Sequence, residues 1–204
     1  MTLVKVTLAK VMLDSLLKEI RACRVCAQDM PHEPRPVIQA AKTAKIVITG
    51  QAPGTRVHAS GRPFTDPSGD RLREWMQVDE AVFYDESKIA IVPMGFCFPG
   101  LDAKGGDLPP RKECAPLWQS RVHENLPHVE LTLLVGLYAQ RFHLASQTQK
   151  TLTETVRQGE RYQPDFLPLP HPSWRNNAWL SKNPWFEAKI LPMLRRRIRE
   201  ILQN

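Results

Sequence analysis

Four cysteines, the only ones in the chain, fall in two widely separated places. Cys23 and Cys26 form a C-x-x-C pair, and Cys97 and Cys114 follow with sixteen residues between them. In a chain that shows no secretory signal, this usage favours metal ligands over disulfides. Structural zinc usually takes two close cysteine pairs, whereas iron–sulfur clusters accept distant ligands. We predict a [4Fe-4S] cluster on the four cysteines, with zinc or four unliganded thiols as alternatives.

Two turns rich in glycine and proline form a second candidate site. They are Gly50-Gln51-Ala52-Pro53-Gly54 and the segment 61–69, which reads Gly-Arg-Pro-Phe-Thr-Asp-Pro-Ser-Gly. Such turns let the backbone approach a ligand closely, and Phe64 offers a flat apolar face between them. The alternative is a long structured loop in which Phe64 fills the core, because glycine and proline mark loops more often than sites.

Short apolar runs predict the strands that must position these turns. They cover residues 45–50, 88–93 and 130–136, with a fourth at 165–170 that leads into His171-Pro-Ser. Helical patterns lie between them, around 69–76, 114–124 and 137–145. The alternation predicts a three-layer α/β/α fold with a central four-stranded parallel sheet. The prolines of the fourth strand confine it to an edge or an end of the sheet.

Two further helices are expected at the ends of the chain. The spacing of Leu13, Leu16, Leu17 and Ile20 predicts a helix that leads to the first cysteine pair. A closing helix is expected to begin at Asn183-Pro184, with a kink at Pro192. In an open parallel sheet ligands bind outside the carboxyl ends of the strands, so the turns after 50 and after 170 should meet at one edge.

Length and composition predict one domain, residues 1–204, in a cytoplasmic protein. Apolar residues make up 42% of the 204, and no apolar run is long enough to cross a bilayer. Lys and Arg outnumber Asp and Glu by 28 to 21, a formal charge of +7 that favours a polyanionic partner. Charge alone does not name the partner, and a basic protein without a nucleic-acid role is the alternative. We expect a monomer that binds no membrane.

The glycine–proline turns, the late His171-Pro-Ser-Trp-Arg-Asn176 and the four cysteines together resemble the uracil-DNA glycosylase superfamily. The closest resemblance is to its iron–sulfur-containing families four and five, and it touches residues 23–177. It implies a DNA partner carrying a damaged base, and removal of that base by hydrolysis.

The resemblance also implies roles for individual residues. Gln51 and Ala52 would line the base pocket, and Phe64 would stack on an extruded base. Ser68 and Gly69 would meet a phosphate, and His171 would lie near base and sugar. The loop after His171-Pro-Ser would enter the minor groove. The residues of this loop that we expect to contact DNA are Ser173, Trp174, Arg175 and Asn176.

Two departures from the family pattern affect catalysis. Val57-His58 stands where family four commonly has Glu-Asp, and Pro93 stands where it has an asparagine. His58 is a candidate for orienting the attacking water, because an unperturbed histidine pKa near 6.5 suits general-base work. A loop histidine that contacts phosphate or nothing is its alternative, and Asp66 and Gln51 are the other candidates. Family five also lacks this carboxylate, so its absence does not exclude glycosylase activity. The absence does leave open whether uracil is the preferred base.

These observations predict a monofunctional DNA glycosylase that hydrolyses the N-glycosidic bond of uracil or another deaminated base in base-excision repair. His58, Gln51 and His171 are the predicted catalytic residues. A DNA-binding module that kept the fold but lost hydrolysis is the alternative, favoured by Val57 and Pro93. A covalent trap for the abasic sugar ranks third. The excised base, the strand preference, the water-activating residue and other repair partners are left open.

Overall fold

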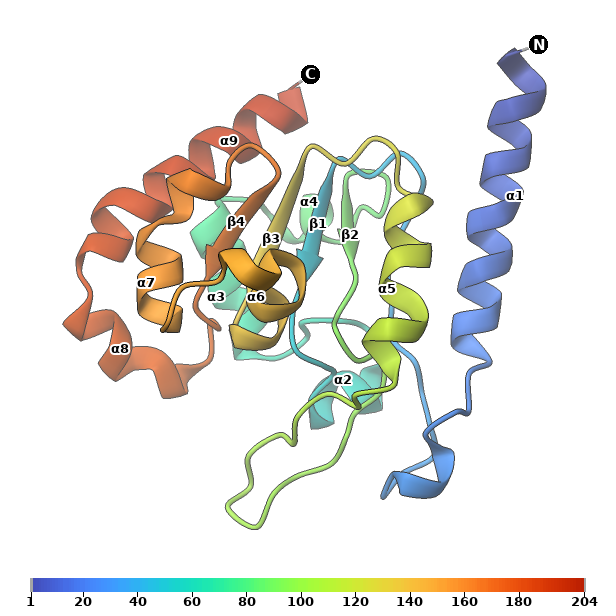
Figure 1. Cartoon of the computed structure of the whole chain (residues 1–204), viewed down its shortest axis with the longest axis horizontal. Helices are drawn as coiled ribbons and strands as arrows, with labels where there is room; N and C mark the ends of the chain where they lie inside the picture. The colour runs from blue at the N-terminus through green and yellow to red at the C-terminus, as the bar shows by residue number, and fades with distance from the viewer. Residues whose placement is uncertain (1, 204) are drawn as a thin grey trace.

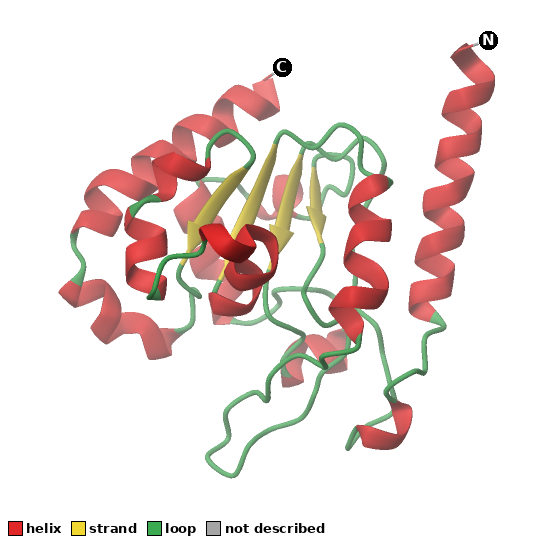
Figure 2. Cartoon of the chain, in the orientation of Figure 1, coloured by secondary structure: helices red, strands yellow, loops and turns green. Residues whose placement is uncertain are grey.

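A computed structural model of the chain describes the backbone of residues 2–203 and the side chains of residues 12–203. Four strands form an all-parallel sheet in the order β2-β1-β3-β4. They are β1 (Ile46–Thr49), β2 (Ile89–Ile91), β3 (Leu131–Val135) and β4 (Phe166–Leu169). Figure 2 shows the four strands side by side, with their arrowheads at one edge. The predicted parallel sheet is confirmed.

Helices cover both faces of the sheet, so the predicted three layers are confirmed as well (Figure 1). The front layer contains α1, α5 and α6, and α3 lies behind the strands. The bounds are α1 (Thr2–Arg21), α2 (Thr55–Ser60), α3 (Pro67–Met76), α4 (Glu80–Phe83), α5 (Cys114–Glu124), α6 (Leu137–Leu144), α7 (Leu152–Arg157), α8 (Asn177–Lys182) and α9 (Leu191–Gln203).

The strands are apolar on both faces because each face packs against helices. Ile46 and Ile48 belong to a buried cluster that includes residues of α3 and α9. Val47, between them, belongs to another cluster with residues of α1 and α5. In register, Ile46 pairs with Ile89 on one side and Leu131 on the other. Successive residues of a strand point to opposite faces, which divides the core into two halves.

β4 is an edge strand, as its prolines predicted. Its Pro168 pairs in register with Leu134 of β3, and no strand of the described chain lies beyond it. Proline has no N–H to donate to a neighbouring strand, and an edge strand tolerates this because one of its sides has no partner strand. This edge places the segment that follows β4, His171-Pro-Ser, at the rim of the sheet.

The expected N-terminal helix packs on α5. Leu13, Leu16, Leu17 and Ile20 are buried in one cluster with Trp118 and other residues of α5. α1 ends at Arg21, two residues before Cys23, and α5 begins at Cys114. The packing of these two helices therefore brings segments of the chain that carry cysteines close together.

One interpretation of the loops needs correction, and the closing helix has an irregularity at the expected place. The alternative of one long loop between residues 50 and 69 is wrong, because this stretch contains the helix α2, which ends at Ser60 with Gly61 as a left-handed C-cap. The closing helix is divided, since residues Phe186–Ile190 form a π-helical turn and α9 starts only at Leu191. Pro192 has no N–H to donate to the preceding turn, which explains why the irregularity lies just before it. No helix of the described chain is long and apolar enough to cross a membrane.

Candidate active site

The turns that follow β1, β2 and β4 meet at the carboxyl edge of the sheet. They line one pocket, which is open to solvent. Its lining consists of Val37, Gly50, Gln51, Ala52, Pro53, Gly54, Val57, Pro63, Phe64, Asp66, Ser68, Ile91, Pro93, Asp107 and His171. Both sequence-predicted turns are therefore present in one pocket, at the edge where open parallel sheets bind ligands.

The Gly50–Gly54 turn is fixed by backbone hydrogen bonds. The N–H of Met94 donates to the carbonyl of Gly50, and the N–H of Gly95 donates to the carbonyl of Gln51, both at 2.9 Å. The turn is thus attached to the segment after β2. A Cβ added at Gly50 would lie 3.4 Å from the Phe64 ring, so glycine lets the aromatic ring approach the turn.

Phe64 adopts a left-handed backbone conformation, with φ of 53°. Two features hold it there. The hydroxyl of Tyr84 donates to the Pro63 and Phe64 carbonyls at 2.8 and 3.0 Å. Gly69 lies so close that an added Cβ would come within 1.9 Å of the Phe64 carbonyl oxygen. Strained conformations of non-glycine residues persist only where the surroundings impose them, and here they direct an aromatic ring to the pocket wall.

Asp66, Ser68 and Gly69 form the start of α3. The Asp66 carboxylate caps the helix, accepting from the N–H of Gly69 at 3.3 Å and from the hydroxyl of Ser68 at 2.6 Å. Ser68 and Gly69 are both buried. The predicted contact of these two residues with a phosphate stays a prediction, and the Ser68 hydroxyl already has a partner within the protein.

His171 lines the pocket directly after β4. Its Nδ1 accepts a hydrogen bond from the N–H of Ser173 at 3.2 Å, which leaves the proton of the neutral ring on Nε2. Desolvation lowers the pKa of His171, while the nearby Asp66 acts in the opposite direction. The side chain can therefore present a neutral N–H donor at neutral pH.

The loop after His171 is braced at several points. The Asn176 amide donates to the His171 carbonyl at 2.7 Å, and Ser173 caps the following 3₁₀ turn. The Arg175 guanidinium donates to the Gly105 carbonyl at 3.0 Å, which joins this loop to the long loop between β2 and α5. Trp174 is 70% exposed. Of the four residues expected to contact DNA here, Trp174 is the one offered to solvent as a large apolar side chain.

His58 is not among the residues that line the pocket. Its ring lies on α2 beside two other rings, 5.4 Å from His32 and 5.7 Å from Phe98 between centroids. Desolvation is the main cause that lowers its pKa, followed by the positive charges of His32 and Arg35. Its predicted role in orienting water stays a prediction, and the pocket has other titratable groups.

One pocket residue was missed by sequence reasoning. Asp107 stands in a Gly-Gly-Asp-Leu-Pro-Pro stretch to which no role was assigned from the sequence. The Gln51 amide donates to the carbonyl of the next residue, Leu108, at 3.0 Å, so the loop is held against the first turn. The position of the stretch after β2, at the carboxyl edge, was the signal that could have identified this carboxylate.

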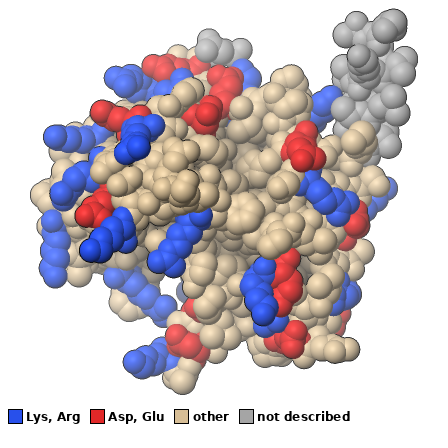
Figure 3. Space-filling view, viewed as in Figure 1, with Lys and Arg blue, Asp and Glu red and all other residues tan. Residues whose placement is uncertain are grey.

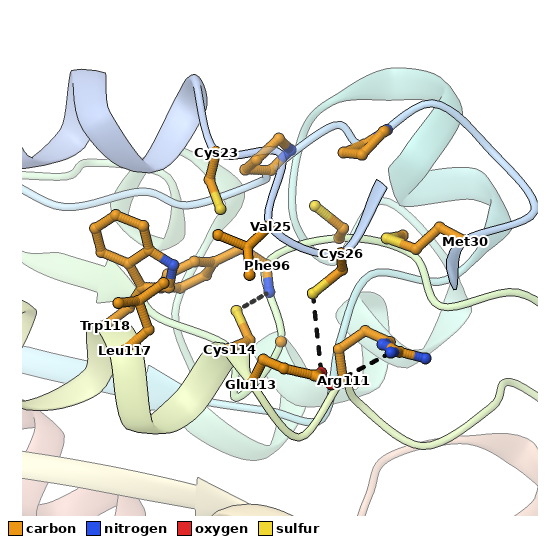
Figure 4. A pocket seen from close by; sticks show the side chains of 14 residues that line it. Cys23, Val25, Cys26, Met30, Phe96, Arg111, Glu113, Cys114, Leu117 and Trp118 are labelled. Atoms are coloured by element: carbon orange, nitrogen blue, oxygen red, sulfur yellow. Dashed lines mark hydrogen bonds and ion pairs between the residues drawn. The ribbon is translucent and has the colours of Figure 1, made fainter. Parts of the chain in front are cut away.

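The four cysteines line a second cavity, which is partly open to solvent. Figure 4 shows the Cys23, Cys26 and Cys114 sulfurs around it, with Phe96 and Trp118 on one side. The thiol of Cys26 lies 3.9 Å from the Glu113 carboxylate, and the N–H of Phe96 donates to Cys114 Sγ at 3.4 Å. The expected convergence of two distant pairs of thiols is thus present.

The four cysteines of this cavity are the predicted ligands of a metal centre. Within the described part of the chain, no three His, Cys, Asp or Glu side chains are arranged to hold a metal ion. Burial raises the pKa of the Cys97 thiol to about 11 and that of the Cys114 thiol to about 12, so burial favours the neutral thiol at both positions.

The fold and the pocket define an α/β/α protein with a pocket at the carboxyl edge of its sheet, lined by the aromatic Phe64 and by His171. A comparison with protein families agrees with this fold. A model described as the uracil DNA glycosylase superfamily matches residues 38–195. The chain belongs to this superfamily. Membership identifies the protein in general terms as a DNA glycosylase, a hydrolase that acts on DNA.

Proposed function

We propose that the protein is a monofunctional glycosylase that removes uracil or another deaminated base from DNA in base-excision repair. The observation that carries this proposal is the single pocket that contains the Gly50–Gly54 turn, Phe64 and His171. An enzyme that acts on a base in a duplex must extrude it, stack it and contact its polar edge. The pocket supplies an aromatic face and close backbone turns for these tasks.

His171 would stabilise the leaving base. As the glycosidic bond breaks, negative charge develops on the base, and a fixed neutral donor near its carbonyl oxygen lowers the barrier. The hydrogen bond from Ser173 to Nδ1 fixes the ring so that Nε2 carries the donor proton. The lowered pKa favours this neutral form at neutral pH.

The mechanism would be hydrolytic, without a covalent enzyme–sugar intermediate. No lysine is among the described residues that line the pocket, so the pocket lacks the amine that a Schiff base requires. The enzyme should release the free base and leave an intact strand with an abasic site.

A single-turnover assay on oligonucleotides that carry one uracil, hypoxanthine or xanthine tests this function. Single strands and U·G and U·A duplexes should be compared, with strand cleavage before and after alkali as the readout. We expect cleavage only after alkali. His171→Ala should slow excision about a hundredfold or more, with partial recovery in His171→Gln, which keeps an N–H donor. His128→Gln, at an exposed position, is the matched control.

The main alternative is a damage-binding module without hydrolysis, favoured by Pro93 in the pocket wall, where family four has an asparagine. Retarded migration of a U·G duplex without any alkali-labile site would support it. An adduct that survives SDS would point instead to the covalent trap.

We also propose that Cys23, Cys26, Cys97 and Cys114 hold a [4Fe-4S] cluster. The support is the donor set of four thiols around one cavity beside apolar side chains. The cluster would join the segment after α1 to the start of α5 and to the segment after β2, and so would act on structure rather than on the bond that breaks.

Metal analysis of the anaerobically purified protein tests the cluster. We expect about four iron and four sulfide per chain with broad visible absorbance. Cys114→Ser should lower both contents together with the melting temperature. A colourless protein that contains one zinc per chain would contradict the cluster and support the zinc alternative.

A further inference from the structure

The pocket contains two carboxylates, Asp66 and Asp107, which differ in their hydrogen bonding. Asp66 is occupied as the cap of α3, where its Oδ1 accepts from Ser68 and Gly69. Among the groups that the structure describes, none hydrogen-bonds the carboxylate of Asp107. A Cβ added at Gly54 would lie 3.5 Å from Asp107 Oδ2, so this carboxylate faces the end of the first turn. Asp107 is therefore the pocket carboxylate that is available for chemistry.

Two side chains from different segments hold the loop that carries Asp107. On one side, the Gln51 amide donates to the carbonyl of Leu108 at 3.0 Å. On the other, Arg175 donates to the carbonyl of Gly105 at 3.0 Å. The loop is also closed on itself, because Leu101 and Asp107 form an antiparallel bridge. Figure 1 shows this loop projecting between β2 and α5 at the carboxyl edge of the sheet.

Gln51 is poorly suited to activate water. An amide has no basic lone pair at neutral pH, and the N–H of this one is already bound to the neighbouring loop. We therefore interpret Gln51, the second residue of the first turn, as a residue that holds the neighbouring loop in place. The group that it supports is the segment Asp107–Leu108.

We propose that Asp107 is the general base that activates the attacking water, and that Gln51 and Arg175 are positioning residues for it. The inference rests on the glycosylase function proposed above. It places the carboxylate on a loop after β2, whereas Val57-His58 stands where family four commonly has Glu-Asp.

The step conserves atoms and charge. Asp107 takes one proton from water while the water oxygen forms a bond to C1′ of the sugar. The C1′–N bond breaks, and its electron pair stays on the base, which His171 stabilises through a hydrogen bond from Nε2. The base anion then takes a proton, and Asp107 returns its own to solvent. The products are the free base and a sugar with a hydroxyl at C1′.

The charges around Asp107 define a pH signature. Desolvation is the main cause that raises its pKa. Asp66 and Asp102 also raise it, and Arg175 lowers it. Activity should be lost as the pH falls through this raised pKa, because the base must be ionised. His171, also in the pocket, adds its own loss at low pH, because its neutral form is the donor.

Substitutions in the loop test the proposal. In single-turnover excision from a uracil oligonucleotide, Asp107→Asn should be slower by about a hundredfold or more at neutral pH. Its affinity for a duplex with a non-cleavable 2′-fluoro-deoxyuridine should stay within about threefold, since the loop keeps its supports.

Asp102→Asn is the matched control. Asp102 Oδ1 accepts from the N–H groups of Lys104 and Gly106 at 2.8 Å, and asparagine keeps an acceptor there. The neutral-pH rate should stay within about threefold, while the acid limb moves to lower pH because a negative charge near Asp107 is lost. Arg175→Gln should move that limb to higher pH. A merely structural role of these residues would not move the limb in opposite directions.

Three outcomes would overturn the proposal. An Asp107→Asn rate within about threefold of the wild type would exclude a general base at this position. Acid limbs that do not move in Asp102→Asn and Arg175→Gln would assign the limb to another group. A wild-type protein that binds the duplex and excises no base would overturn the proposed function together with this inference, whereas an active wild type with an unaffected Asp107→Asn overturns the inference alone.

Discussion

At the scale of single residues, the pocket depends on close approaches of backbone that particular residues permit. The left-handed Phe64, with φ of 53°, is held by the hydroxyl of Tyr84 and by the proximity of Gly69. The Arg62 guanidinium lies 3.5 Å from the centre of the Tyr84 ring, which helps to keep the tyrosine in place. The position of the aromatic face in the pocket is thus determined by its neighbours more than by Phe64 itself.

Gly69→Ala should destabilise the protein by about 1–3 kcal/mol, because the new Cβ meets the Phe64 carbonyl at 1.9 Å and the backbone must move. Urea unfolding followed by circular dichroism measures the change. Gly54→Ala is the control, since its Cβ would meet only ordinary contacts and its φ of −88° suits any residue. Equal midpoints of unfolding for Gly69→Ala and the wild type would show that the segment relaxes freely.

At the scale of elements, α5 and α6 pack through two histidines. The rings of His123 and His143 lie 5.0 Å apart between centroids, and their buried Nε2 atoms have no hydrogen-bond partner among the described groups. Desolvation lowers the pKa of both, that of His143 to about 4. Glu130 and Asp165 lie at the same groove.

The stability of the protein should therefore fall as the pH drops from about 6.5 toward 4. In this window the two histidines are protonated in the unfolded chain but neutral in the folded protein. The free energy of unfolding therefore falls by up to about 1.4 kcal/mol per pH unit for each histidine. His143→Leu should reduce the slope of unfolding free energy against pH, measured by urea titrations at several pH values. His128→Gln, on the surface, should leave it unchanged. A wild-type slope of zero in this window would contradict the prediction.

At the scale of the whole molecule, the charge of +7 is spread unevenly. In Figure 3 the Lys and Arg side chains gather over the region that α7, α8 and α9 occupy in Figure 1. Exposed cations on these helices and the adjoining π-helical turn include Arg157, Lys182, Lys189 and Arg196. Near the pocket, by contrast, Arg71 and Arg175 donate to backbone carbonyls and so stabilise loops. A DNA partner would meet many exposed cations on one flank of the molecule and, at the carboxyl edge, a pocket rim whose loops are joined by arginine hydrogen bonds.

Local patterns in the sequence were enough to predict the architecture and the family. Apolar runs bounded by glycine identify buried strands because both faces of a covered sheet exclude water, and Pro168 predicted the edge because it lacks a donor. Short motifs such as Gly50–Gly54 and His171-Pro-Ser carry their turn chemistry within a few residues. They could therefore be assigned to the superfamily before any contact was known.

Only the tertiary structure decided which side chains face the pocket. His58 and Asp107 both lie in polar segments after a strand, yet His58 packs beside His32 and Phe98, whereas Asp107 lines the pocket. The contact that places Asp107 joins Gln51 to Leu108, 57 residues apart. The direction of a loop side chain depends on such distant partners, and no pattern of neighbouring residues encodes them.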